Sequence, residues 1–258
     1  MSPDPTTRFS ARVENYRRYR PSYPPEMLAF LERECGLTPA ARIADIGCGT
    51  GLLAQVLLRF GCEVFGVEPN AEMRAAAEEA LAAETRFHSI AGRAEATTLP
   101  DAAFDVVTAG QAFHWFDPAG ARREFARILK PNGWLVLVWN ERAAGGGFQA
   151  AYETVVKDCA AERTRIEEDA IDLVFGHHDW RLVEFPNRQV MNMESLQGRL
   201  ASSSYAPLPD TPEYDRLVRE LNHIFAKHEQ DGSVTLLYDT KVYAGRLTAR
   251  NDTPYRSA

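Results

Sequence analysis

The feature that most restricts the fold of this chain is a glycine-rich segment, Gly47-Cys-Gly-Thr-Gly51, placed between two apolar stretches. The stretch before it, Arg42–Ile46, predicts a short strand, and the stretch after it, Leu52–Phe60, predicts a helix that Gly61 ends. Glycine has no Cβ, so the backbone N–H groups of such a turn can approach a ligand closely. The segment therefore predicts an α/β fold with a ligand site at the turn.

The same alternation continues through the first 140 residues. Apolar, β-rich stretches predict further strands, and alanine-rich or proline-started stretches predict the helices between them. This order is typical of a Rossmann-like, doubly wound α/β fold, in which helices cover both faces of a parallel sheet. The predicted strands are 63–67, 86–91, 104–109 and 134–139, and the predicted helices are 71–83 and 118–129.

The remainder of the chain is expected to add to this core within a single domain, 1–258. After a glycine-rich joint at 143–147, the pattern predicts a helix over 148–168, a strand near 181–185, a helix over 214–227 and a last strand over 234–247. We assign 36–141 to the cofactor-binding core, 9–35 to an N-terminal lid, and 148–178 with 192–232 to cap or insertion segments.

Composition narrows the classes of partner. Of the 258 residues 45% are hydrophobic and 25% charged, which is typical of a soluble globular chain, and the net charge of −7 disfavours nucleic acid. No apolar run approaches the roughly 20 residues of a membrane span, and no signal peptide is visible, so we expect a cytoplasmic protein. The four cysteines form no C-x-x-C pair, and His177-His178-Asp179 has no third ligand at a suitable spacing, so no metal is expected.

Two ligands suit the glycine turn, and the charge of Asp45 discriminates between them. A dinucleotide would bring its diphosphate near this carboxylate, a repulsion of about 4 kcal/mol for unit charges about 4 Å apart. S-adenosylmethionine (AdoMet) has no phosphate and carries an ammonium and a sulfonium, which an acidic neighbour attracts. The turn therefore favours AdoMet, with a nicotinamide-dependent oxidoreductase and a non-catalytic AdoMet-binding regulatory module as alternatives.

Further candidates follow the other strands. Glu68 ends the second strand about 20 residues after the turn begins, where an acid can accept both ribose hydroxyls. Side chains beyond the carboxyl ends of the third and fourth strands are expected near the adenine and the reacting methyl group. The candidate cofactor-binding residues are Asp45, Gly47, Cys48, Gly49, Gly51, Glu68, Pro69, Met73, Ala94, Glu95, Gln111, Ala112 and Arg20.

The motifs resemble those of class I AdoMet-dependent methyltransferases of the small-molecule type. The resemblance rests on 45–51, on Val67-Glu-Pro-Asn70, on Gln111-Ala-Phe-His-Trp-Phe116 and on Leu129-Lys-Pro-Asn-Gly133. It implies a seven-stranded, mostly parallel sheet with an antiparallel last strand. It also implies that the glycine turn holds the methionine part of AdoMet and that Glu68 holds the ribose. The Asn/Asp-Pro-Pro-aromatic motif of nucleic-acid enzymes is missing after the fourth strand, which further disfavours DNA or RNA.

The inferred reaction is an in-line displacement at the sulfonium methyl group by a small-molecule acceptor, in which the protein supplies mainly proximity and alignment. His114 is the candidate general base, with a purely packing role as the alternative. Arg20 can pair with the methionine carboxylate, and Arg142 and Arg199 are, like Arg20, compatible with an acceptor that bears a carboxylate. The candidate substrate-contacting residues are Tyr16, Tyr19, Tyr23 and Trp115.

Overall fold

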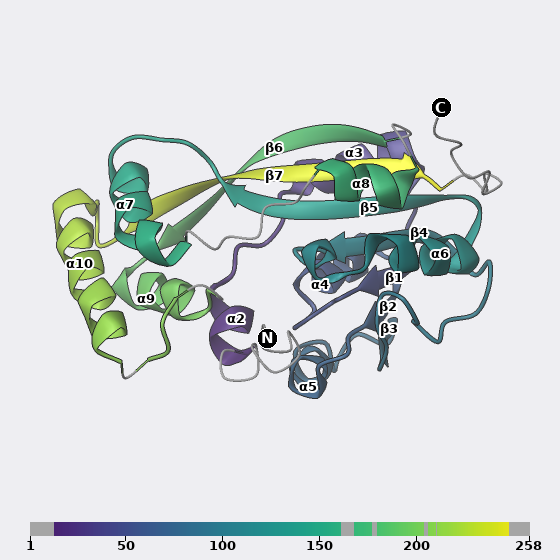
Figure 1. Cartoon of the computed structure of the whole chain (residues 1–258), viewed down its shortest axis with the longest axis horizontal. Helices are drawn as coiled ribbons and strands as arrows, with labels where there is room; N and C mark the ends of the chain where they lie inside the picture. Colours follow the sequence, from purple (N-terminus) through teal and green to yellow (C-terminus); the bar gives the residue numbers. More distant parts are fainter. Residues whose placement is uncertain (1–12, 161–167, 177–179, 204–205, 210, 248–258) are drawn as a thin grey trace, which may run out of the picture.

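The computed structural model describes residues 13–160, 168–176, 180–203, 206–209 and 211–247, and within them seven strands form one sheet (Figure 1). The strands are β1 (Arg42–Ile46), β2 (Glu63–Val67), β3 (Phe87–Ile90), β4 (Phe104–Gly110), β5 (Leu129–Arg142), β6 (Trp180–Met191) and β7 (Val234–Arg246). Their order is β3-β2-β1-β4-β5-β7-β6. Six strands are parallel and β7 is antiparallel to both neighbours, which confirms the predicted fold class.

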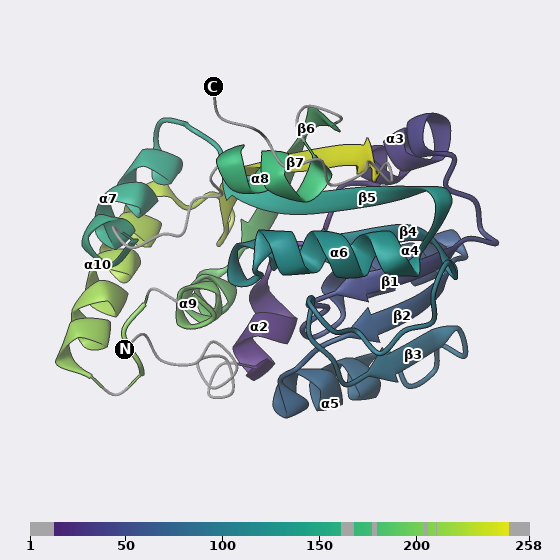
Figure 2. The same cartoon turned by 45° about the vertical axis from the view of Figure 1, so that its right-hand side comes forward.

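Helices cover both faces of this sheet, as Figure 2 shows. On one face, α3 (Pro25–Cys35), α4 (Leu52–Phe60) and the end of α5 (Ala71–Ala80) pack against β1 and β2. On the other face, α6 (Pro118–Ile128) and α8 (Glu168–Phe175) pack together against β4 and β5. Continuous apolar strands suit this arrangement because both of their faces are buried.

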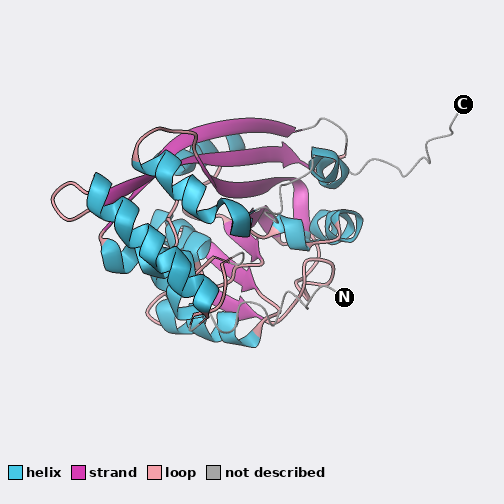
Figure 3. Cartoon of the chain, turned by 60° about the vertical axis from the view of Figure 1, so that its left-hand side comes forward, coloured by secondary structure: helices cyan, strands magenta, loops and turns pink. Residues whose placement is uncertain are grey.

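The far ends of β6 and β7 extend beyond this core. β5 ends where Arg142 pairs with Tyr238, whereas β6 and β7 remain paired as far as Met191 and Val234. Three helices pack on this extension and enclose a separate apolar cluster (Figure 3). We call these helices, with the extension, the cap; they are α7 (Phe148–Ala160), α9 (Met193–Ala201) and α10 (Pro212–His228).

The cap differs from the segments that the sequence predicted. The segment 148–178 divides, because α7 joins the cap while α8 packs against α6 on the core sheet. The sixth strand is longer than the predicted 181–185, because its second half alternates exposed with partly buried residues beside β7. Residues 161–167, in the last part of the helix predicted over 148–168, lie outside the described residues.

The first described helix, α2 (Val13–Tyr19), contacts α9 of the cap on one side and α5 of the core on the other (Figure 1). Amide side chains of the sheet fix the chain that follows it. Asn140 donates to the carbonyls of Pro21 and Ser22, and Asn187 donates to that of Ser22 at 2.8 Å. The described part of the predicted N-terminal lid, from residue 13, thus starts as a helix that contacts both core and cap. No helix in the described part of the chain is long and apolar enough to cross a membrane.

Candidate active site

A hollow in two adjoining parts lies beyond the carboxyl ends of the core strands, and the glycine turn is in its wall. The two parts share Tyr16, Gly47, Gly49, Gly110 and Gln111. The first, the β2 end, is also lined by Glu68, Pro69, Asn70, Met73, Ala112, Trp115 and Phe116. The second, the cap end, is also lined by Arg20, Pro21, Tyr23, Cys48, Thr50, Leu52, Leu53, Asn140 and Arg199.

The glycine turn requires its glycines. The φ angles of Gly47 and Gly49 are +67° and +56°, in the left-handed region that side chains disfavour. A Cβ on Gly47 would lie 2.6 Å from the Cβ of Ala112, so the turn and the end of β4 approach too closely for any side chain. Gly51 has a different role, because it begins α4 with φ +83°, faces Leu81 and does not line the hollow.

Glu68 joins the turn to the end of β2. One carboxylate oxygen accepts from the N–H of Gly49 at 3.0 Å, and the other accepts from the N–H of Asn70 at 2.9 Å. Burial raises the pKa of Glu68 above its ordinary value, while these two N–H groups and Arg74 act in the opposite direction. The side chain is held rigidly at the wall of the hollow, with lone pairs left to accept hydroxyl groups of a ligand.

Asp45 does not lie where the sequence argument needs it. Its side chain is fully buried behind the turn, accepts from the Thr108 hydroxyl at 2.8 Å, and lines neither part of the hollow. Its Oδ2 atom has no hydrogen-bond partner among the described residues. Burial raises the pKa of Asp45 to about 7, so much of its charge is lost at neutral pH. The choice of AdoMet over a dinucleotide therefore cannot rest on direct attraction by this carboxylate.

The segment after β4 supplies one wall. Gln111 has φ +59°, its N–H donates to the Val138 carbonyl at 2.8 Å, and its side-chain amide donates to the Asn140 carbonyl. This conformation is unusual for a residue other than glycine and turns the chain across the hollow. Ala112 and Trp115, both candidate residues from the sequence, line the β2 end as a result.

His114 lies beside this wall without lining the hollow. Its Nδ1 atom is buried and has no hydrogen-bond partner among the described residues. Burial, together with the charge of Arg20, lowers the pKa of His114 to about 4. A base of this strength is poorly matched to proton abstraction at neutral pH, so the packing role is favoured over the catalytic one.

The two candidate residues in the loop after β3 do not contribute to the hollow. Ala94 is buried, and Glu95 accepts from the N–H of Asp117 at 2.9 Å, beside the start of α6 that Asp117 caps. Neither residue lines the hollow. The adenine contact expected of this loop therefore finds no support in the lining of the hollow, whereas Pro69 and Met73, two other candidate cofactor-binding residues, do line it.

The aromatic and basic residues in and after α2 fall into two groups, those that line the hollow and one that contacts the cap. Tyr16, Arg20 and Tyr23 line the hollow, and burial raises the pKa of Tyr23 well above its ordinary value. Tyr19 instead faces α9, where its hydroxyl donates to Glu194 at 3.0 Å and its ring covers Gly198. The substrate contact predicted for Tyr19 is replaced by contact with the cap.

Several lining residues were not predicted from the sequence. Phe116 and Asn70 belong to the motifs quoted above and could have been included on that ground. Thr50 lies inside the glycine turn, and Asn140 follows an apolar strand at the sheet edge where ligands bind, so position alone could have indicated both. Arg199 was noted only as an arginine compatible with a carboxylate-bearing acceptor, and no local signal placed it at the hollow, which it reaches from α9, far along the chain.

Metal binding finds no support in the described part of the chain, where no group of three or more His, Cys, Asp or Glu side chains could hold an ion. The sequence 177–179 lies outside the described residues. Cys48 lines the hollow as a neutral thiol, because burial raises its pKa well above the ordinary value.

Comparisons with known proteins agree with this geometry. A family model described as "Methyltransferase domain" matches residues 44–137. The uncharacterized methyltransferase Rv3342 of Mycobacterium tuberculosis is 42% identical over 228 residues, which cover 87% of this chain and 88% of that protein. The uncharacterized methyltransferase C25B8.09 of Schizosaccharomyces pombe is 27% identical, covering 84% and 86%.

Solved structures share the fold at low identity. A candidate type II methyltransferase of Anaeromyxobacter dehalogenans has a TM-score of 0.67 at 21% identity, covering 90% of this chain and all of that one. A phosphoethanolamine N-methyltransferase of Haemonchus contortus, solved with S-adenosylhomocysteine, has a TM-score of 0.55 at 18% identity, covering 94% and 57%. With the glycine turn, the acid after β2 and a relative 42% identical over most of its length, the chain belongs to the class I AdoMet-dependent methyltransferases.

Proposed function

We propose that this enzyme transfers the methyl group of AdoMet to a small-molecule acceptor bound at the cap end of the hollow. The observation that carries the proposal is the hydrogen bond between Gly49 and Glu68, which brings the turn after β1 and the acid after β2 to the wall of one hollow. The acceptor reaches this hollow between α2, the end of β5 and α9, since all three contribute to the cap end.

The residues present fit AdoMet. Glu68 offers acceptor oxygens for ribose hydroxyls, and Pro69 and Met73 offer apolar surface for the adenine. The Thr50 hydroxyl is buried, has no hydrogen-bond partner among the described residues and belongs to the wall of the cap end. Thr50 and Arg20 would hold the polar groups of the methionine part.

The chain's own contribution is alignment rather than proton transfer. Bound AdoMet supplies a methyl group that its sulfonium already activates. The turn, Glu68 and the wall at Gln111 would hold one reactant in a fixed orientation, and Tyr16 and Tyr23 also line the cap end of the hollow. Such positioning can contribute about 7–11 kcal/mol to lowering a bimolecular barrier. The low pKa of His114 and the high pKa of Tyr23 suit neither residue to act as a general base at neutral pH.

Three observations support a small molecule over a macromolecule as acceptor. The cap end lies beneath α2 and α9, both of which contribute side chains to it, so bulky partners are hindered. The net charge of −7 opposes a polyanionic partner. The Haemonchus enzyme, which shares the fold, was solved with phosphomonomethylethanolamine, a small acceptor.

The test is calorimetric titration with S-adenosylhomocysteine. Glu68→Ala should weaken binding at least tenfold, or about 1.4 kcal/mol, because the ribose loses a charged acceptor. Glu78→Ala, an exposed residue of α5, is the matched control and should bind as the wild-type protein does. Equal affinities of wild-type and Glu68→Ala proteins would remove the ribose role, and no binding by the wild-type protein would refute the proposed function.

A further inference from the structure

The chain between α2 and α3 forms one wall of the hollow. We call residues 20–24 the strap, and Arg20, Pro21 and Tyr23 of this segment line the cap end. In the structure the strap belongs to no helix or strand, and its prolines, Pro21 and Pro24, have no N–H group to donate to a strand ladder. The position of this wall therefore depends on the groups that bind the strap from outside.

Side-chain amides of the sheet bind the strap through its carbonyl groups. Asn187 of β6 donates to the Ser22 carbonyl at 2.8 Å. Asn140 of β5 donates to the carbonyls of Ser22 and Pro21 at 3.2 and 3.4 Å. Two neighbouring amides thus hold the middle of the strap, and Asn140 itself lines the cap end beside it.

The orientation of the Asn140 amide is fixed from the other side. The Thr240 hydroxyl of β7 donates to Oδ1 of Asn140 at 2.5 Å, and Nδ2 of Asn187 donates to the same oxygen at 3.2 Å. A reversed amide would place its nitrogen beside these two donors and its oxygen beside two carbonyl groups, so the network permits one orientation. The oxygen of Asn140 therefore binds the sheet, and its nitrogen binds the strap.

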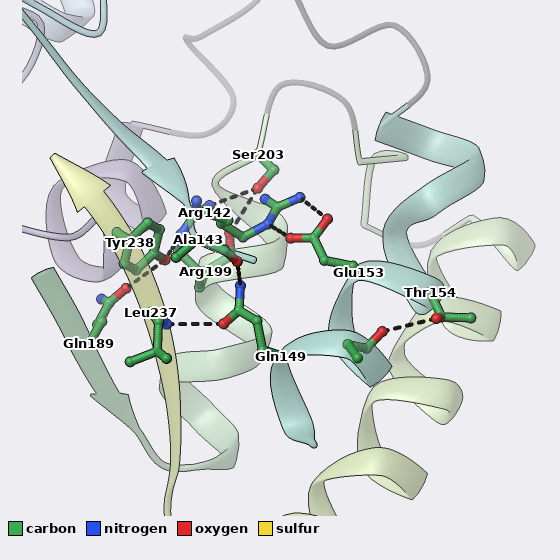
Figure 4. Close-up of polar contacts among 11 residues, drawn as sticks. Arg142, Ala143, Gln149, Glu153, Thr154, Gln189, Arg199, Ser203, Leu237 and Tyr238 are labelled. Atoms are coloured by element: carbon green, nitrogen blue, oxygen red, sulfur yellow. Dashed lines mark hydrogen bonds and ion pairs between the residues drawn. The ribbon is translucent and has the colours of Figure 1, made fainter. Parts of the chain in front are cut away.

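The end of α2, just before the strap, is held in the same way. Gln189, two residues after Asn187 on β6, donates to the Tyr19 carbonyl at 2.9 Å. Figure 4 shows that the carbonyl oxygen of Gln189 in turn accepts from Tyr238 of β7 at 3.3 Å. No residue of α2 is buried. Polar contacts with β5 and β6 therefore run along the segment from the end of α2 to Ser22.

We propose that Asn187 and Thr240 are positioning residues of the active site, which hold the strap against the methionine part of the cofactor. The proposal rests on the proposed function, because that function places the methionine part at the cap end. Neither residue lines the hollow, so each acts on the ligand through Asn140 and the strap. Weakening this network should displace the wall at the cap end and leave the β2 end, which the core forms, unchanged.

The first experiment titrates Asn187→Asp with S-adenosylhomocysteine and with 5′-methylthioadenosine, which lacks the amino-acid part. The substitution keeps the shape of the side chain but replaces the N–H donor by an acceptor that opposes the Ser22 carbonyl. We expect the Kd of S-adenosylhomocysteine to rise at least about fivefold, through faster dissociation, whereas that of 5′-methylthioadenosine should stay within about twofold. Asn222→Asp is the matched control and should bind both ligands normally, because Asn222 is exposed on α10 and its oxygen accepts from Gln197.

The second experiment separates the hydroxyl group of Thr240 from its packing. Thr240→Val keeps the shape but removes the hydrogen bond to Asn140, so the Kd of S-adenosylhomocysteine should rise about two- to fivefold. Thr240→Ser loses a methyl group but keeps the hydroxyl, so it should bind within about twofold of the wild-type protein. A role in packing alone predicts the reverse order. Far-UV circular dichroism checks that each variant is folded, and this pair tests the proposal even where Asn187→Asp does not fold.

The failures are distinguishable. Absence of S-adenosylhomocysteine binding by the wild-type enzyme refutes the proposed function. Unchanged affinity in folded Asn187→Asp, an equal loss of affinity for both ligands, or tighter binding by Thr240→Val than by Thr240→Ser would overturn the positioning role while leaving the methyltransferase function in place. Association and dissociation that quicken together at constant Kd would make the strap a gate that does not contribute to binding, and would overturn it too.

Discussion

The core and the cap are built on different principles. In the core, β1, β2 and β4 are each followed by a helix that packs on the sheet, as β1 is by the glycine turn and α4, and most residues that line the β2 end of the hollow lie in the short segments after these strands. The cap gathers three helices around one strand pair, and its members come from 148–160, 180–201 and 211–237. The comparison teaches that the β2 end of the hollow depends mainly on short segments next to strands, whereas the cap end also depends on segments that are distant in the sequence.

The junction between the two regions is polar. Each region has its own apolar cluster, but Asn140, Asn187 and Thr240 join the sheet to the chain after α2 through hydrogen bonds. Hydrogen bonds of this kind fix the path of the chain, and each contributes only modestly to stability, about 0.5–1.5 kcal/mol.

The largest effect is expected from the core, at the glycine turn. Gly49→Val should weaken S-adenosylhomocysteine binding at least roughly a hundredfold, because φ +56° strains a β-branched residue and the side chain would enter the hollow. Gly146→Val, at an exposed glycine with no neighbour within 4 Å, is the control and should bind normally. Calorimetry and far-UV circular dichroism would check both, and normal binding by folded Gly49→Val would show that the turn does not contact the ligand.

The next largest effect is expected on stability, and it tests whether burial of the Asp45 carboxylate lowers the free energy of unfolding at neutral pH. Its pKa of about 7 exceeds the ordinary value near 4, so between these pH values the folded state binds more protons than the unfolded state. The free energy of unfolding should therefore fall as pH rises, by about 2 kcal/mol between pH 5 and pH 7 from this group. Asp45→Asn should lose that part of the slope. Identical slopes of urea-derived stability against pH in both proteins would contradict the assignment.

A smaller effect should come from the contact between the cap and α2. A Cβ on Gly198 would lie 2.1 Å from the Tyr19 ring, so Gly198→Ala must displace the ring and weaken its bond to Glu194. We expect a cost of about 1 kcal/mol, since the ring can yield at its partly exposed edge. Hydrogen exchange over 13–23 should quicken. Adding Tyr19→Ala removes the clash, so the double variant should cost less than the sum of the single changes.

The same contrast explains what the sequence could predict. The parallel order, the seven strands and the residues around Glu68 follow from local patterns, in which a strand, a turn and a helix occupy about 20 consecutive residues. The resemblance to class I methyltransferases extended this to the antiparallel last strand. Asp45 was misjudged because a position at a strand end does not reveal which way the side chain points, and here it faces Thr108.

The residues at the cap end of the hollow were harder to predict from the sequence, for a physical reason. Arg199 approaches the hollow only because α9 packs on the extension of β6 and β7, and neither the length of β6 nor the packing of α9 is encoded locally. Tyr19 and Tyr23 are four residues apart in one aromatic cluster, yet one contacts the cap and the other lines the hollow. Which face of such a cluster meets the ligand depends on tertiary contacts that periodicity does not specify.

The smallest effect is expected at His114, on the boundary of the two regions. With a pKa of about 4 this imidazole is neutral near pH 7, and it does not line the hollow, so His114→Ala should reduce kcat by less than about threefold. His114→Asn, which fills more of the same space, should reduce it less. Because any base in the reaction would have to titrate elsewhere, the pH profile of kcat/KM should be the same in all three proteins. A hundredfold loss of kcat, with loss of an inflection from that profile, would instead make His114 the base and place proton transfer in the core wall.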